Sequence, residues 1–146
     1  MCEEIKKEIH LFYSEMYKIH QRYANKRWED PKNMVAFISD INQINDTYKC
    51  DFCNTVTNCL REWYKKGFCG VQNRREEYQK IYIRLSVLHR KYAEQCPEVN
   101  FAQFIDEAEK IATDYPGVPW VKTIMLGISE ELENQRFITA KNVTAE

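Results

Sequence analysis

Glycine and proline are scarce in this sequence, with four of each among 146 residues. Folds built from many short strands need these residues at their turns, so the scarcity argues against sandwiches and barrels and favours helices. The apolar fraction of 44%, which includes three Trp, nine Tyr and seven Phe, is ample for a hydrophobic core. At this length we expect a single domain.

Long hydrophobic runs are missing as well. No apolar stretch approaches the roughly 20 residues that a membrane-spanning helix needs. The N-terminus carries charges within its first seven residues, where a secretory signal would have an apolar segment. We therefore expect an intracellular protein, cytoplasmic or nuclear, with no membrane association. In those compartments the six cysteines are expected to be free thiols.

Known catalytic motifs are also absent from the sequence. It has no glycine-rich phosphate loop, no G-x-S-x-G motif and no pair of histidines at metal-binding spacing. Adjacent carboxylates diverge on a helix, so we interpret three such pairs as solvated: Glu3–Glu4, Glu76–Glu77 and Glu130–Glu131. The sequence predicts a protein that is not an enzyme and needs no cofactor.

Helical periodicity is the strongest pattern present, and it is clearest in residues 73–96. The apolar residues there recur at alternating steps of three and four, which places them on one stripe of a helix: Tyr78, Ile81, Leu85, Leu88 and Tyr92. Asn73 and Glu76 have the spacing of a capping box, and Pro97 ends the pattern. We expect this helix, about 36 Å long, to be the centre of the fold.

The remaining helices are predicted from similar patterns. Residues 3–23 form a near-heptad seam, Asp30 and Pro31 begin a second helix, and shorter helices follow Asn100 and Pro119. Between residues 31 and 66 we prefer a break near 45–47 over one continuous helix. The sequence thus predicts an all-α, single-domain bundle of five or six helices over residues 1–137, with 138–146 a frayed tail. The first helix is apolar over a face wider than one neighbour covers, so a homodimer through it is a further expectation.

The cysteine spacing raises the question of a metal site. Four cysteines lie within twenty residues: Cys50, Cys53, Cys59 and Cys69. Cys50 and Cys53 have the spacing of half a zinc site, but a second close pair is missing, so we favour free thiols and keep a zinc-stabilised helical module as an alternative. A redox role for the Cys-x-x-Cys motif is disfavoured, because that motif usually begins a helix after a strand and no strand is expected.

Charge is distributed unevenly along the chain. Residues 61–96 contain nine basic and four acidic side chains, whereas residues 97–146 contain four basic and nine acidic ones. We favour the interpretation that the two blocks pack against each other. The alternative is nucleic-acid binding by the basic turn at residues 61–75, where aromatic rings could stack on bases. The pI of about 6.3 argues against that alternative, since such modules usually exceed a pI of about 9.

The aromatic content suggests an interaction surface, because Tyr and Trp are enriched at protein interfaces. Tyr13, Tyr17, Trp28 and Tyr64 lie off or at the edge of the apolar stripes, so they are candidates for exposure; the alternative is that the bundle uses tyrosine at its rim, with the hydroxyl in water. The sequence predicts an adaptor or scaffold domain that binds a partner's helix or peptide through an aromatic groove with a basic rim. The residues selected for that role are Tyr13, Tyr17, Arg61, Trp63, Tyr64, Arg74 and Arg75.

Overall fold

The computed structural model describes residues 2–66 and 75–137, and the secondary-structure elements within these ranges are all α-helices. The helices are α1 (Cys2–Tyr23), α2 (Pro31–Tyr48), α3 (Asp51–Lys65), α4 (Arg75–Ala93), α5 (Phe101–Asp114) and α6 (Trp120–Asn134). The predicted all-α bundle is confirmed. None of the helices in these two ranges is long and apolar enough to cross a bilayer.

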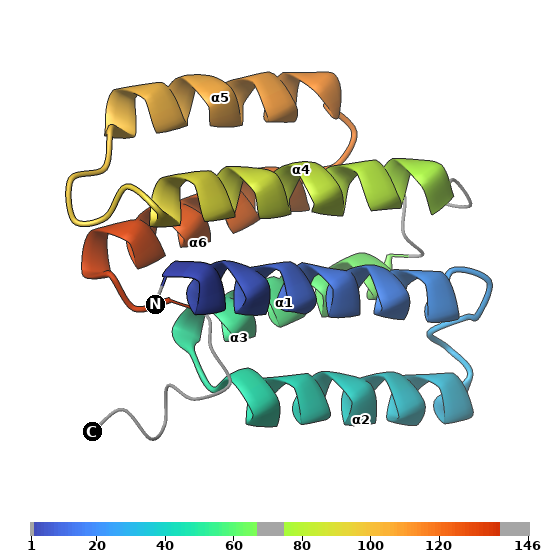
Figure 1. Cartoon of the computed structure of the whole chain (residues 1–146). Helices are drawn as coiled ribbons and strands as arrows, with labels where there is room; N and C mark the ends of the chain where they lie inside the picture. The colour runs from blue at the N-terminus through green and yellow to red at the C-terminus, as the bar shows by residue number, and fades with distance from the viewer. Residues whose placement is uncertain (1, 67–74, 138–146) are drawn as a thin grey trace.

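Four of the helices form the centre of the bundle (Figure 1). α1 runs antiparallel to α4, and α3 runs antiparallel to α6 behind them. α2 packs on one side, against α1 and α3, and α5 packs on the opposite side, against α4 and α6. The predicted central helix is α4, and it ends at Ala93, three residues before the predicted end.

The segment 31–66 is broken, as the sequence analysis preferred. Asp30 caps α2, its Oδ1 accepting the Lys32 N–H at 3.0 Å, and Pro31 occupies the first helical position. α2 ends where Lys49 adopts the left-handed conformation, with φ 41°, and Cys50 is extended before α3 begins. The break therefore lies at 49–50 and not at 45–47. The low helix propensity of residues 45–47 is too weak an effect to end a helix whose apolar face is buried.

The start of α5 is only half a capping box. Asn100 Oδ1 accepts the Gln103 N–H at 3.1 Å, as predicted. The Asn100 N–H is not bound by Gln103; it donates instead to Gln95 Oε1 at 2.9 Å. Asn73 of the other predicted capping box, and the predicted frayed tail 138–146, lie outside the described residues.

The contact between α1 and α4 is the most extensive in the bundle. The predicted stripe of α4 is buried, and so is the α1 seam from Ile9 to Tyr23. Because this seam is covered within the chain, the original reason to expect a homodimer through it no longer applies. A homodimer itself stays a prediction.

His20 lies completely buried in that contact. Its Nδ1 is 2.8 Å from the Tyr82 hydroxyl, and its ring stacks on Tyr78 with centroids 4.3 Å apart. Burial lowers the pKa of His20 from its ordinary value of 6.5 to about 3, so the imidazole is neutral in the folded protein.

We predict that His20 makes the fold acid-sensitive. Below pH 6.5 the unfolded chain binds a proton at His20 that the folded chain refuses, so stability falls as the pH drops toward 3. One pH unit corresponds to about 1.4 kcal/mol, so acidification to about pH 5 should cost about 2 kcal/mol at this residue. Urea unfolding at about pH 6.5 and about pH 5 gives the loss of unfolding free energy on acidification, and this loss should be smaller in His20→Gln than in wild type. His10→Gln, at an exposed position of the same helix, is the control and should show the wild-type loss.

Candidate functional site

The predicted aromatic anchors do not form a surface. Tyr13, Trp63 and Tyr64 are buried, so the interpretation of Tyr13 and Tyr64 as candidates for exposure is wrong. Trp63 packs edge-on against Trp120 of α6, with ring centroids 6.1 Å apart. Tyr13 and Tyr64 lie off the main stripes but are still buried, because α1 and α3 each contact more than one neighbouring helix and the second neighbour covers them.

Tyr17, the remaining predicted anchor, and Trp28 are less deeply buried. Tyr17 is half-buried and packs against the core. Trp28 is also half-buried, and its ring meets that of Tyr64 edge-on at 5.5 Å. Tyr17 and Trp28, the other two candidates for exposure, are therefore partly accessible.

The predicted basic rim is only partly described. Arg61 is half-buried and lies 3.9 Å from the carboxylate of its neighbour Glu62. Arg75 is the first residue of α4, and Arg74 lies outside the described residues. Nucleic-acid binding by residues 61–75 thus stays a prediction.

The charge blocks meet where α5 packs on α4. Arg84 of α4 is paired with Asp114 of α5 at 2.7 Å, and Lys91 is paired with Glu107 at 2.6 Å. These exposed pairs contribute little stability each, but they match the two blocks across one contact. They support the interpretation that the basic and acidic segments complement each other within the fold.

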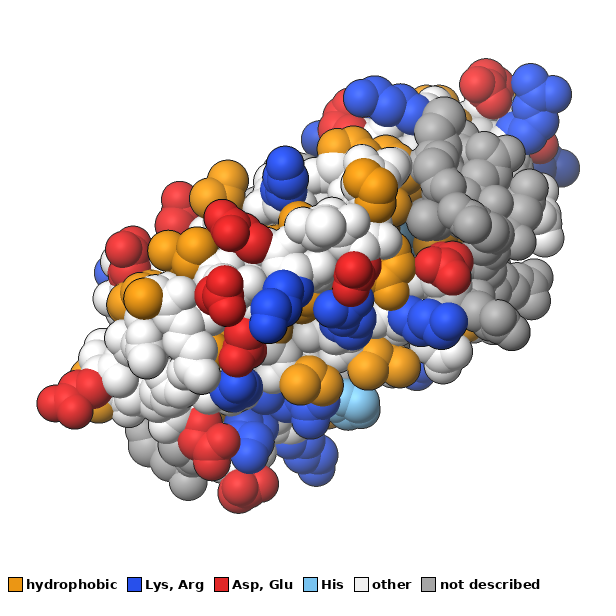
Figure 2. Space-filling view, turned by 90° about the horizontal axis from the view of Figure 1, so that it is seen from above, with side chains coloured by type: hydrophobic (Ala, Val, Ile, Leu, Met, Phe, Trp, Pro, Cys, Tyr) orange, Lys and Arg blue, Asp and Glu red, His pale blue; other side chains and the backbone are white. Residues whose placement is uncertain are grey.

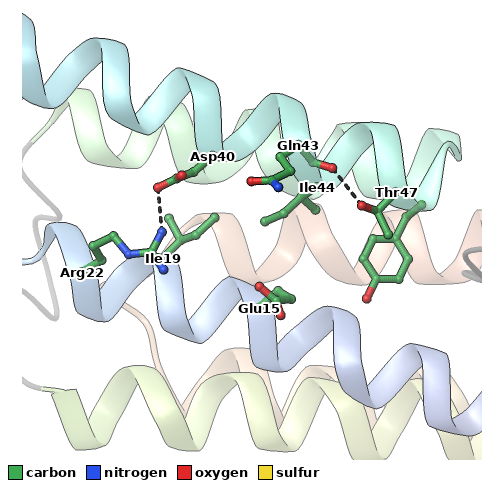
Figure 3. Close-up of a pocket in the computed structure, with 8 residues that line it drawn as sticks. Glu15, Ile19, Arg22, Asp40, Gln43, Ile44 and Thr47 are labelled. Carbon is green, nitrogen blue, oxygen red and sulfur yellow. Dashed lines mark hydrogen bonds and ion pairs between the residues drawn. The ribbon is translucent and has the colours of Figure 1, made fainter.

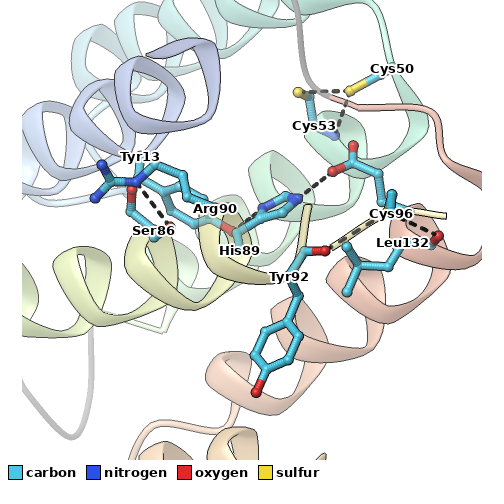
Figure 4. Close-up of polar contacts among 10 residues, drawn as sticks. Tyr13, Cys50, Cys53, Ser86, His89, Arg90, Tyr92, Cys96 and Leu132 are labelled. Carbon is cyan, nitrogen blue, oxygen red and sulfur yellow. Dashed lines mark hydrogen bonds and ion pairs between the residues drawn. The ribbon is translucent and has the colours of Figure 1, made fainter. Parts of the chain in front are cut away.

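The candidate zinc ligands separate into a pair and two others. Cys50 and Cys53 have their sulfurs 3.0 Å apart (Figure 4). Cys59 lies two turns further along α3, hydrogen-bonded to Thr123 of α6, and Cys69 lies outside the described residues. Among the residues the structure describes, no three His, Cys, Asp or Glu side chains are grouped closely enough to hold a metal ion. Of the described candidate ligands, only this pair lies close enough together to share a metal ion.

A buried polar network crosses the bundle beside this pair. His89 Nδ1 lies 3.0 Å from the Tyr13 hydroxyl, and His89 Nε2 is hydrogen-bonded to Glu131 Oε1 (Figure 4). Glu131 is buried, so the interpretation of the Glu130–Glu131 pair as solvated is wrong for its second member. The sequence held the signal, since Glu131 falls three residues after buried Ile128, on the same face of α6.

Burial determines the protonation of the network. It raises the pKa of Tyr13 well above 10, so this hydroxyl keeps its proton and can donate to His89 Nδ1. Burial also raises the pKa of Glu131, while His89 opposes that shift. The second carboxylate oxygen, Oε2, is buried with no hydrogen-bond partner among the described residues.

We predict that Glu131→Leu destabilises the protein by about 3 kcal/mol, because it leaves the buried His89 N–H without an acceptor. The neighbouring carboxylate supplies a matched control. Glu130 is exposed, so Glu130→Leu should change the free energy of unfolding by less than about 0.5 kcal/mol. Urea unfolding of both variants measures the difference, and equal effects would show that the network does not stabilise the fold.

A cleft between α1 and α2 has a volume of about 280 Å³ and is lined by polar residues (Figure 3). Asp40 of α2 accepts hydrogen bonds from both Arg22 and the Tyr23 hydroxyl at 2.7 Å. Arg22 and Asp40 thus pair across the helix contact, and Glu15, the third charged residue of the cleft, lies 3.8 Å from Lys18 of its own helix. The cleft is better explained as part of the α1–α2 packing than as a binding site.

A larger groove of about 900 Å³ lies between α5 and α6. Its floor consists of buried apolar side chains: Phe104, Ala108, Val118 and Met125. Ile105 and Leu126 also line it, and they remain 53% and 67% exposed. Seen from the α5 side, apolar side chains form separate patches among charged ones (Figure 2). Isolated exposed apolar residues are common, but two that line the same apolar groove suggest a binding surface.

The surroundings of the groove are acidic and not basic. Together, α5 and α6 carry seven acidic and two basic residues. Glu109 and Lys122 lie at the groove itself, and Asp106, Glu130 and Glu133 are exposed on the same two helices. The basic rim predicted from the sequence is therefore not a property of this groove.

Comparisons with protein-family models, with curated proteins and with solved structures find no match to this chain. Function must then be inferred from the chemistry of the chain itself. The α5–α6 groove, with a volume of about 900 Å³, is lined by Leu126, the most exposed large apolar side chain of the described residues. We take it as the candidate functional site.

Proposed function

We propose that this chain is an interaction domain, an adaptor or scaffold, that binds an amphipathic helix of a partner protein in the α5–α6 groove, without catalysis at that groove. The exposure of Leu126 and Ile105 beside an apolar floor supports the proposal most directly. The proposed function is still that of an interaction domain, as predicted from the sequence, but Leu126 and Ile105 replace the predicted aromatic anchors. An intracellular location, cytoplasmic or nuclear, likewise stays a prediction.

The energetics favour a ligand that covers both exposed side chains. Complete burial of one Leu or Ile side chain yields about 1.5–3 kcal/mol, so Leu126 and Ile105 are plausible energetic centres of an interface. A helix reaches both walls and the floor at once, with apolar residues at positions i, i+3, i+4 and i+7. Strand addition has no support, since the described residues contain no sheet edge.

The charge around the groove specifies the partner further. Asp106 and Glu109 are exposed on α5 beside Ile105, and Glu133 is exposed on α6. A partner helix whose apolar stripe is flanked by Lys and Arg would complement these carboxylates. Such rim charges mainly accelerate association and select the partner, so the binding should weaken moderately as salt rises.

We predict that Leu126→Asp and Ile105→Asp each weaken binding of a helical leucine–lysine peptide by about tenfold, or about 1.4 kcal/mol. A labelled peptide of about 15 residues is long enough to span the groove as a helix. Fluorescence anisotropy gives the Kd, and amide shifts in NMR spectra show which helices the peptide contacts. The expected shifts lie on α5 and α6.

Val35→Asp is the matched control, because Val35 is 62% exposed on α2, on the opposite side of the bundle. It should leave the Kd unchanged. A peptide with glutamate in place of lysine should bind more weakly than the original. Equal losses in Val35→Asp and Leu126→Asp, or shifts spread over all helices, would contradict the proposed groove.

A further inference from the structure

Cys50 and Cys53 occupy the start of α3, at the end of the bundle where α2 ends. Cys50 is the N-cap residue, and its sulfur accepts the backbone N–H of Cys53 at 3.4 Å. Both are free thiols with sulfurs 3.0 Å apart. The motif thus begins a helix, as redox-active Cys-x-x-Cys motifs usually do. The preceding strand is absent, because α2 takes its place.

The two thiols have different surroundings. Cys50 is half-buried and lines a cavity of about 610 Å³, whereas Cys53 is completely buried. The hydrogen bond between the two thiols lowers the pKa of Cys50, and burial raises the pKa of Cys53. A helix N-terminus also favours a thiolate over a thiol. The Cys50 thiol therefore lines the cavity and has a lowered pKa, whereas the Cys53 thiol is buried and has a raised pKa.

The cavity joins the dithiol to the buried polar network. It lies between the N-terminal part of α1, the start of α3 and the C-terminal part of α6. Apolar residues such as Ile5, Phe52 and Phe137 form part of its wall, with Gly127 between them. The charged groups that face it are Lys49, Asp51, Glu130, Glu131 and Arg136. The unpartnered Oε2 belongs to Glu131, one of these cavity residues.

We propose that Cys50 and Cys53 form a redox-active dithiol that exchanges with disulfides of peptides or proteins entering this cavity. The inference is independent of the α5–α6 groove, since no residue lines both sites. The apolar wall suits an unfolded or extended polypeptide segment, and the substrate's own disulfide is the oxidant.

The exchange proceeds in two steps that balance. The Cys50 thiolate attacks one sulfur of the substrate disulfide, so a Cys50–substrate bond forms and the other substrate sulfur leaves as a thiolate. That thiolate takes up the proton that Cys50 released. Cys53 then attacks the Cys50 sulfur and gives its proton to the second leaving sulfur. Two electrons have passed from the dithiol to the substrate, which ends as two thiols; the reverse sequence oxidises a substrate dithiol.

The test uses the full chain, equilibrated in buffers of reduced and oxidised glutathione, then alkylated and mapped by mass spectrometry. A reversible Cys50–Cys53 bridge is expected in wild type. In the reduced protein, Cys50 should react with iodoacetamide about tenfold faster than Cys59, a half-buried thiol whose pKa burial raises. This rate comparison needs no variant, so it holds even where a substitution impairs folding.

Variants then separate the roles of the two sulfurs. Cys53→Ser should accumulate a mixed disulfide between Cys50 and glutathione, because the resolving thiol is gone, and Cys50→Ser should form neither product. Cys59→Ser and Cys96→Ser are controls that should behave as wild type. The proposal is overturned if Cys50 is no more reactive than Cys59, if the bridge does not form, or if zinc bound by the purified protein blocks Cys50 from alkylation.

Discussion

The antiparallel register of α1 against α4 is the constraint on which the other contacts depend. Two buried hydrogen bonds connect these helices, Tyr13 to His89 and His20 to Tyr82. Tyr13 and His20 are seven residues apart on α1, and Tyr82 and His89 are seven apart on α4. Each helix thus offers one tyrosine and one histidine at matching depth, and the pairs are reciprocal.

This reciprocity makes the register specific. A slip of one heptad would set Tyr13 beside Tyr82, or His20 beside His89, and leave other buried polar groups without partners. A buried polar group without a partner destabilises the fold by more than a buried hydrogen bond stabilises it, so the shifted registers are strongly disfavoured. Apolar seams alone would tolerate such a slip far better. The remaining helices then pack on a pair whose alignment is already fixed.

Periodicity predicted the helices because the burial of one face determines where apolar residues must lie. The stripe of α4 and the caps at Asp30 and Asn100 follow from local chemistry and could be located from the sequence. The burial of Tyr13 and Tyr64 could not, because it depends on which second neighbour covers the flank of a helix. Amphipathic residues such as tyrosine suit both a rim and a core.

The candidate sites were harder to predict from the sequence, because they depend on how the helices pack against one another. Leu126 belongs to an apolar helix, and only the packing of α5 against α4 leaves it facing a groove. Glu131 looks like its exposed neighbour Glu130 until the direction of the α6 face is known. The Cys50–Cys53 spacing was visible, but its chemistry depends on where α2 ends, and that was predicted a few residues too early.

The capping of α3 by a cysteine joins a reactive atom to a structural one. Cys50 Sγ is at once the accessible sulfur and the acceptor for the Cys53 N–H. Any bond formed at that sulfur competes with its role as a cap, and capping interactions are worth about 0.5–2 kcal/mol. By thermodynamic linkage, the folded chain then favours the unmodified sulfur to the same extent. Modification of Cys50 and loss of the α3 cap are thus thermodynamically coupled.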